Sequence, residues 1–216
     1  MELLREIIKE QNFELSFEDL IKEIKSNALY DSNMPIFRGM YPENKFGKKY
    51  IRKDRKPRDT TESDTEFFNK IFEKEYGISN IRFQTAFLTS SSGEAREYGI
   101  PHYIFPVKGS KFIYNKKVDD SVSLVRGLKY LQILSHELDI DLEKDNILEI
   151  VNKVKDYENN KATPVERIKI DNLLNSMDKI SNYTVSEKLP DLKRIRSEIM
   201  LLGEYYYFIK THTVEI

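Results

Sequence analysis

Hydrophobic positions recur with two different spacings along this chain, and the spacing separates helical from extended segments. Residues 16–29, SFEDLIKEIKSNAL, repeat their apolar positions every three or four residues behind a capping serine, which predicts an amphipathic helix. A second helix is predicted over 61–76, where acidic residues occupy the first turn and Gly77 follows as the C-terminal stop. The first third of the chain therefore contains at least two helices by this criterion.

Short apolar runs predict strands between and after these helices. The runs are IFRGMY after the turn-forming DSNMP, the alternating residues 81–88, PHYIFPV, KFIYN, EIMLL at 198–202 and YYYFIK at 205–210. Tyrosines 205–207 fit cross-strand packing, and His102 fits a structural polar position in its strand better than a catalytic base. Strands at this density predict a sheet.

Residues 120–181 have a different character, with three helical segments and no strand. The segments are LVRGLKYLQILSHEL, NILEIVNKVKDYE and TPVERIKIDNLLNSMDKI, the last opening with a threonine cap and a proline at its first helical position. We therefore expect an α+β fold in a single domain, residues 1–216, with N-terminal helices and a helical insertion at about 120–181. The apolar stripes of the insertion fit either core packing or a partner surface.

Composition narrows the classes of function. Hydrophobic residues make up 39% and charged residues 33% of the chain, the balance of a soluble globular protein, and the net charge of −1 gives no overall attraction to nucleic acid or anionic membrane. Cysteine is absent, which excludes disulfides, thiolate nucleophiles and cysteine-based zinc sites, and the three histidines lack metal-ligand spacing. The opening MELLREIIKEQNFEL is neither a signal peptide nor a membrane span, so a cytoplasmic protein without a metal is predicted.

One segment carries a strong local charge bias. Residues 45–58, KFGKKYIRKDRKPR, hold eight basic residues against the single acid Asp54. This basic loop could contact nucleic-acid phosphates, with Tyr50 available to stack on a base. It could equally be a solvated loop, and the charge pattern alone leaves both interpretations open.

Three polar stretches stand at the ends of predicted strands and are candidates for chemistry. They are Arg38 and Gly39 in FRGM, the hydroxyl run in FLTSSSGEAREYG, and Glu198 in SEIMLLGEYYYF. Each alone has an ordinary explanation, namely a surface ion pair, a helix N-cap and a solvent-facing strand residue. A Walker-type loop and a GxGxxG motif are both absent from the sequence, which excludes P-loop and Rossmann nucleotide binding.

Taken in this order, the three stretches resemble the mono-ADP-ribosyltransferases of the Arg–Ser–Glu class, found among bacterial toxins and phage-encoded modifiers. The resemblance covers mainly 34–114 and 183–210, and the chain is also similar to a group of uncharacterised tailed-phage proteins. It implies a split β-sandwich fold and transfer of ADP-ribose from NAD to a host macromolecule, either a protein or a nucleic acid.

The resemblance assigns Glu198 the catalytic role, in which its carboxylate holds the ribose 2′-hydroxyl and stabilises the positive charge that develops as nicotinamide leaves. Arg38 would bind the NAD pyrophosphate or the adjoining ribose, because a guanidinium can donate two parallel hydrogen bonds to one phosphate. Gly39 would let other groups approach the backbone closely.

The hydroxyl run and the residues after it complete the expected NAD site. Thr89 and Ser91, with Ser90 as the alternative register, would brace the nicotinamide ribose and orient Glu198. Tyr98 would stack on the nicotinamide ring. These assignments follow from the resemblance and not from spacing.

Arg196 departs from the pattern of the arginine-modifying members, which carry Glu or Gln two residues before the catalytic glutamate. A cation cannot act as the general base there, so protein arginine is disfavoured as the acceptor, which leaves another side chain, a nucleic acid or simple NAD hydrolysis open. Arg196 is assigned to binding an anionic acceptor. Two other functions remain open: a non-catalytic protein of the same fold that binds a host factor or counters a defence, and a virion-associated structural protein.

Overall fold

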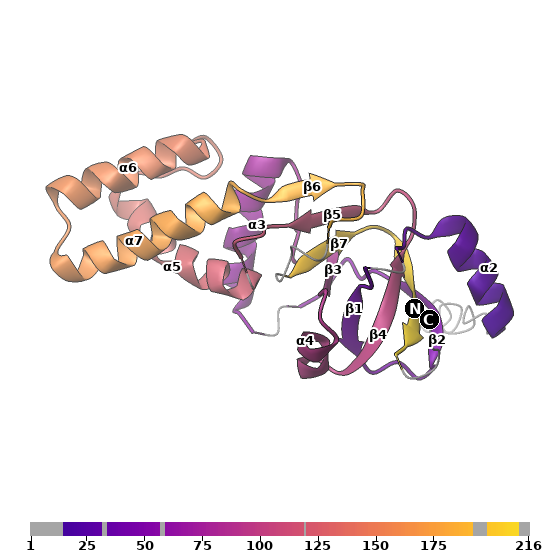
Figure 1. The fold of residues 1–216 in the computed structure, drawn as a ribbon. Coiled ribbons are helices and arrows are strands. Elements are labelled where there is room, and N and C mark those ends of the chain that lie inside the picture. Colours follow the sequence, from indigo (N-terminus) through magenta and orange to yellow (C-terminus); the bar gives the residue numbers. More distant parts are fainter. Residues whose placement is uncertain (1–14, 32–33, 57–58, 119, 192–197, 212–216) are drawn as a thin grey trace, which may run out of the picture.

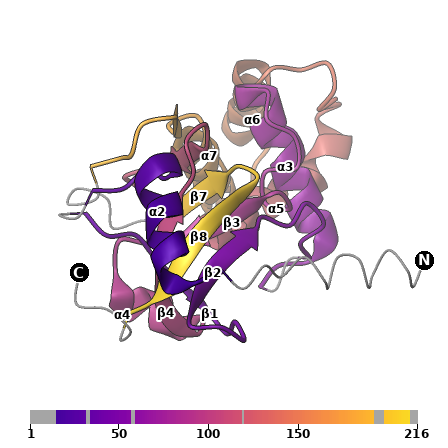
Figure 2. The ribbon, with the colours of Figure 1, turned by 90° about the vertical axis from the view of Figure 1, so that its right-hand side faces the viewer.

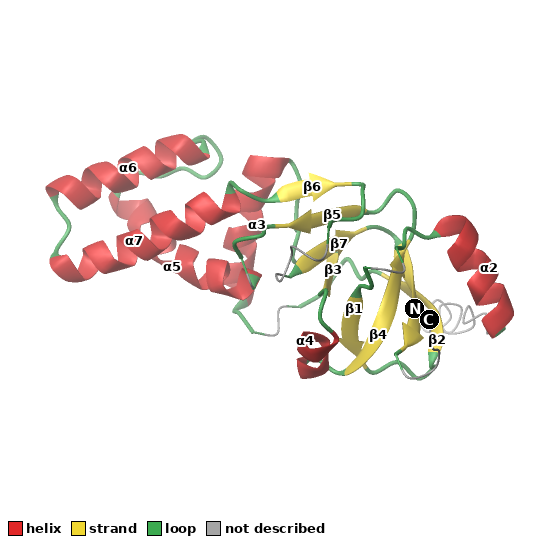
Figure 3. Ribbon diagram, viewed as in Figure 1, coloured by secondary structure: helices red, strands yellow, loops and turns green. Residues whose placement is uncertain are grey.

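The structure is a computed structural model that describes residues 15–31, 34–56, 59–118, 120–191 and 198–211. Six helices and two antiparallel sheets of four strands each form this part of the chain (Figure 3), which confirms the expected α+β class. The helices are α2 (Phe17–Asn27), α3 (Glu62–Tyr76), α4 (Ser92–Glu97), α5 (Ser121–Glu137), α6 (Ile147–Asn160) and α7 (Pro164–Ile180). The strands are β1 (Phe37–Met40), β2 (Phe46–Tyr50), β3 (Thr85–Leu88), β4 (Ile100–Pro106), β5 (Lys111–Tyr114), β6 (Thr184–Ser186), β7 (Ile199–Leu202) and β8 (Tyr205–Lys210).

The two sheets face each other across an apolar core. The first sheet has the strand order β1-β4-β8-β2 and the second β3-β7-β5-β6. Alternation in β8 shows the layering, since Tyr206 and Phe208 pack between the sheets whereas Tyr207 and Ile209 pack beneath α2. Helix α2 therefore covers the outer face of the first sheet (Figures 1 and 2), and the outer face of the second sheet packs into a core shared with α3, α5 and α7.

Helices α5, α6 and α7 follow one another between β5 and β6 and extend away from the sheets (Figure 1); we call residues 121–180 the helical unit. Helix α5 packs against both α7 and α3, and Leu128 of α5 is fully buried in their shared core. Asn146 and Glu149 form a capping box at the start of α6, and Thr163 and Glu166 form another at the start of α7. The predicted helices of this region thus form with their ends satisfied.

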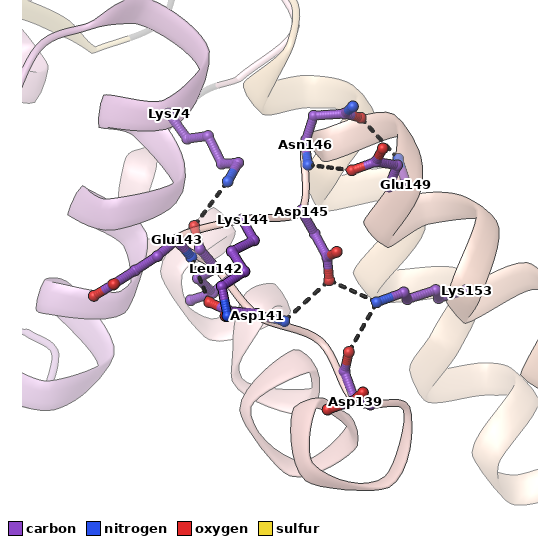
Figure 4. Close-up of polar contacts among 10 residues, drawn as sticks. All are labelled: Lys74, Asp139, Asp141, Leu142, Glu143, Lys144, Asp145, Asn146, Glu149 and Lys153. Atoms are coloured by element: carbon purple, nitrogen blue, oxygen red, sulfur yellow. Dashed lines mark hydrogen bonds and ion pairs between the residues drawn. The ribbon is translucent and has the colours of Figure 1, made fainter.

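Side chains of α3 and α6 hold the connection between α5 and α6 in place (Figure 4). The carboxylate of Asp145 accepts hydrogen bonds from the backbone N–H of Asp141 at 3.0 Å and from Nζ of Lys153 at 2.7 Å. From α3, Nζ of Lys74 donates to the carbonyl of Leu142 at 2.9 Å. A loop rich in acidic residues is therefore fixed by two lysines that stand on different helices.

The basic segment 45–58 is not a loop throughout, and that expectation was wrong for its first part. Residues 46–50 form β2, which pairs antiparallel with β8 along the edge of the first sheet. Charged lysines are well suited to an edge strand because they discourage pairing with another chain. The charge pattern hid the strand, since Lys48 and Lys49 occupy positions where a buried strand would be apolar.

Two further boundaries differ from expectation. The strand predicted over 81–88 begins only at Thr85, because the N–H groups of Phe83 and Gln84 donate to the carbonyl of Asn80 and form a turn. A short strand, β6, pairs with β5 just after the helical unit and was not predicted. None of the helices in the described ranges has both the length and the apolar character that crossing a bilayer requires.

Candidate functional site at the junction of the two sheets

The two sheets meet where β1 crosses the end of β3; we call this place the junction. Phe37 and Thr89 exchange backbone hydrogen bonds of 2.8 and 2.9 Å there. This isolated bridge is not part of the strand pairing within either sheet. Arg38 follows directly in β1 and is half-buried, with its Cζ 5.9 Å from the ring centroid of Tyr206 in the core between the sheets. The Arg38 side chain therefore extends from the junction along the inner face of the first sheet, toward Tyr206.

Glu198 reaches the same place from the other end of the chain. Strand β3 pairs with β7 so that Leu88 lies opposite Ile199, which places Glu198 across from Thr89, one residue beyond the last pair. The register therefore brings the backbones at Arg38, Thr89 and Glu198 together, although these residues are distant in sequence.

Glu198 is half-buried, and its carboxyl group belongs to a short chain of polar side chains. Ser121, at the first turn of α5, donates its hydroxyl to Oε1 of Glu198 and accepts from Nη1 of Arg82. Burial raises the pKa of Glu198 to about 7, while the positive charge of Arg82 and the hydrogen bond from Ser121 act in the opposite direction. The carboxyl group consequently changes its charge near neutral pH.

A third arginine, Arg55, contacts the same aromatic ring as Arg82. Cζ of Arg55 lies 4.3 Å from the ring centroid of Phe87 and Cζ of Arg82 lies 5.2 Å from it, so both guanidiniums approach one aromatic ring. Burial, followed by repulsion from Arg38 and Arg82, lowers the pKa of Arg55 to about 10, and the charge of Glu198 partly opposes this. Arg55 therefore stands in the fields of both Arg38 and Glu198. We call Arg38, Arg55, Arg82, Ser121 and Glu198 the junction site.

The hydroxyl run holds the start of α4. The hydroxyl of Thr89 donates to the carboxylate of Glu94 and accepts from the N–H of Ser91 at 3.1 Å, while Oγ of Ser91 caps the helix by accepting from the N–H of Glu94 at 3.2 Å. Ser90 between them is half-buried. The hydroxyl that donates to Glu198 in this structure belongs to Ser121, whereas the hydroxyl of Thr89, across the strands from Glu198, donates to Glu94.

Gly39 and Tyr98 both lie against α4. A Cβ added at Gly39 would stand 1.9 Å from the carbonyl oxygen of Ala95, so the group that approaches this glycine is the helix backbone. Tyr98 follows the last turn of α4 and is 56% exposed. Burial and then the charges of Asp120 and Glu198 raise the pKa of its phenol.

Arg196 lies outside the described residues, so its expected role as an acceptor-binding residue has no structural counterpart here. His102 is buried within β4, where Nδ1 lies 2.7 Å from the carbonyl oxygen of Ile100 and burial lowers the imidazole pKa. No group of histidine or carboxylate side chains in the described segments is arranged to hold a metal ion.

Two cavities lie elsewhere on the molecule. One, of about 100 Å³, is lined by residues of the loop before β1 and of β4, and the other lies along α5 and α7. Neither is lined by Arg38, Thr89 or Glu198.

Sequence reasoning did not single out Arg55, Arg82 or Ser121. Arg55 was one of eight cations in a biased run, and Arg82 stood in a segment that was interpreted as a regular alternating strand. The available signal was Asp120-Ser121, a capping pair at the start of an apolar helix, but a cap does not reveal which carboxylate its neighbour meets.

Comparison of the chain with protein-family models, with curated proteins and with solved structures finds no significant match.

Proposed function

We propose that the protein is an NAD-dependent mono-ADP-ribosyltransferase with an ADP-ribosyltransferase-like split β-sandwich, phage-encoded and acting in the host cytoplasm on a protein or a nucleic acid. The observation that carries the proposal is the register at the junction, which gathers Arg38, the hydroxyl run and Glu198 at one place.

The chemistry asks for a carboxylate and cations in this arrangement. In the proposed reaction the bond between nicotinamide and ribose C1′ breaks, nicotinamide leaves with the bonding electrons, and the acceptor bonds to C1′ and loses its proton to water. Positive charge develops on the ribose, and ionised Glu198 would stabilise it. Ser121 and Arg82 would keep the carboxylate oriented and favour its charged form.

The fit to NAD rests on the donors of the junction site. Its guanidiniums offer permanent positive charge and paired N–H groups, which match the two negative charges of a dinucleotide's diphosphate. Tyr98 offers an exposed ring for stacking, and its phenol senses the charge of Glu198. Both features support a ligand that carries a diphosphate at one end and an aromatic ring at the other.

The proposal is tested with NAD labelled in its adenylate phosphate, incubated with pure protein and a bacterial lysate. Wild-type protein should release nicotinamide and transfer label to a macromolecule, and Glu198→Gln should slow the release by about 10²- to 10³-fold. Glu204→Gln, which makes the same change on the exposed hairpin next to β7, is the matched control and should leave the rate unchanged. Absence of release from wild-type protein would refute the enzyme and favour the non-catalytic binding protein.

A further inference from the structure

We propose that Arg55 is a second anion-binding residue of the junction site and that it binds the diphosphate of the ligand jointly with Arg38. The identity of the diphosphate as part of NAD rests on the proposed function. The anion site itself rests on different observations, which concern hydrogen bonding and charge around Arg55.

The first observation is an unsatisfied donor. Three buried side-chain nitrogen or oxygen atoms in the described residues have no hydrogen-bond partner, on Arg55, Asn69 and Ser110. Nη1 of Arg55 is the only one of these that belongs to a charged group. Burying a charged donor without a partner is costly, and a bound anion is one way in which such a donor is satisfied.

The second observation is uncompensated charge. Among the described residues, no ion pair joins Arg38, Arg55 or Arg82 to a carboxylate; the ion pairs that do form lie elsewhere, three of them exposed and one, Lys153–Asp145, partly buried. Glu198 is the carboxyl group that interacts electrostatically with Arg55 and Arg82. Its pKa is raised to about 7, so it is only partly ionised at neutral pH. A bound anion would relieve the repulsion that lowers the pKa of Arg55.

The third observation is that Arg55 is held in place while its donor stays free. Its guanidinium lies against the ring of Phe87, and its backbone N–H donates to the carbonyl of Phe83 at 3.3 Å. A guanidinium fixed against an aromatic ring loses little further freedom on binding, which favours bidentate contact with a phosphate. Lys49, whose pKa is lowered by burial and by the charge of Arg38, adds positive charge beside the site.

The experiment measures binding of inorganic pyrophosphate and of ADP-ribose to the intact protein by calorimetry. Arg55→Gln should weaken both affinities by about 10- to 100-fold, the loss of a charge-assisted hydrogen bond. Arg52→Gln, an exposed arginine of the same segment paired with Asp54, is the matched control and should change them less than twofold. Adenosine, which has no phosphate, should bind wild-type protein and Arg55→Gln equally.

A second variant distinguishes the loss of an anion contact from the loss of the fold. Arg55→Lys keeps the charge but loses the planar fork, so its pyrophosphate affinity should lie between those of wild type and Arg55→Gln. Thermal melting of both variants should show that they are folded, because removing a buried cation from a repulsive cluster does not remove any native ion pair.

The outcomes separate this inference from the proposed function. Equal pyrophosphate affinity for wild type and Arg55→Gln, with NAD cleavage intact, would overturn the role of Arg55 and leave the enzyme standing. Arg55-dependent pyrophosphate binding without NAD cleavage would support the anion site and refute the enzyme. If Arg55→Gln weakened binding of a single-stranded oligonucleotide but not of pyrophosphate, the diphosphate assignment would be overturned.

Discussion

The junction site and the helical unit differ in how far their polar groups are paired within the protein. In the helical unit the caps are closed by their own side chains, as in the Asn146–Glu149 box, and the α5–α6 loop is tied by two lysines (Figure 4). At the junction, Arg55 and Arg82 both interact electrostatically with one partly ionised carboxyl group, and Nη1 of Arg55 has no hydrogen-bond partner.

The difference separates what stabilises the fold from what a ligand could use. A polar group that is satisfied inside its own helix has no remaining capacity for a partner, whereas an unsatisfied buried donor costs stability until a ligand binds. The helical unit does expose large apolar side chains, namely Ile133, Leu148, Val165 and Ile168. Single exposed apolar residues are common on protein surfaces and need no special explanation.

The largest expected effect is the pH dependence of activity at the junction. If the ionised form of Glu198 is the active one, nicotinamide release per enzyme at low NAD should fall about tenfold for each pH unit below about 7, a 100-fold loss by about pH 5. Initial rates over the pH range would measure this. A rate that stays flat down to about pH 5 would mean that this carboxyl group is not the one that acts.

Ser121→Ala sharpens the same measurement. The hydrogen bond from Ser121 lowers the pKa of Glu198. Losing this hydrogen bond should raise that pKa, so the fall in rate at acid pH, the acid limb of the pH–rate profile, should begin at a higher pH. Ser123→Ala is the control, because that hydroxyl donates to the backbone carbonyl of Asp120 and is exposed. An unchanged limb in Ser121→Ala would contradict the hydrogen-bond chain.

In the helical unit the largest effect is on stability. Leu128→Ala removes a fully buried side chain between α3, α5 and α7 and should lower the free energy of unfolding by about 2–5 kcal/mol. Ile133→Ala on the exposed side of the same helix should change it by less than about 0.5 kcal/mol. Denaturant titration measures both, and below the transition both proteins should keep wild-type pyrophosphate affinity. Loss of that affinity in folded Leu128→Ala would break the separation of the two regions.

Glu198→Gln should also change how stability depends on pH. The folded pKa of Glu198 is about 7 against an ordinary value of 4.5, so the folded state binds the proton more tightly. Its contribution to stability is complete below about pH 4.5 and is lost as pH rises to about 7. The melting temperature of Glu198→Gln relative to wild type should therefore increase over this window. A constant difference would show that the carboxyl group is not perturbed.

The smallest effect concerns one helix cap. Thr163→Ala opens the capping box at the start of α7 and should cost about 1 kcal/mol of unfolding free energy. Activity at the junction should be unaffected, and thermal melting together with the nicotinamide assay would show this. A shift in the acid limb of the pH–rate profile would instead show that the helical unit and the junction site are energetically coupled.

Local pattern was sufficient for much of the fold. The helices at 16–29, at 61–76 and within 120–181, and the strands around FRGM, PHYIFPV, KFIYN, EIMLL and YYYFIK, were predictable because periodicity, caps and glycine stops agree in these segments. Strand β2 was missed because an edge strand needs little apolar surface, and β6 because its three residues carry no pattern. Sheet order depends on long-range pairing, which no local window contains.

For the site, the sequence could offer only the residues of the three strand ends, and their register came from the structure. Arg55, Arg82 and Ser121 could not be found in this way, since their importance depends on contacts between β3, α5 and the segment after β2. Gly39 shows the reverse case, because a glycine assigned to ligand approach is needed for the backbone of α4.

A crystal structure of the Glu198→Gln protein with NAD tests the central claim most directly, because this variant should bind the dinucleotide without cleaving it. The account predicts the diphosphate against Arg38 and Arg55 and the nicotinamide ribose between Thr89 and the side chain at position 198. NAD bound in either of the two cavities away from the junction, or facing a different surface altogether, would contradict it.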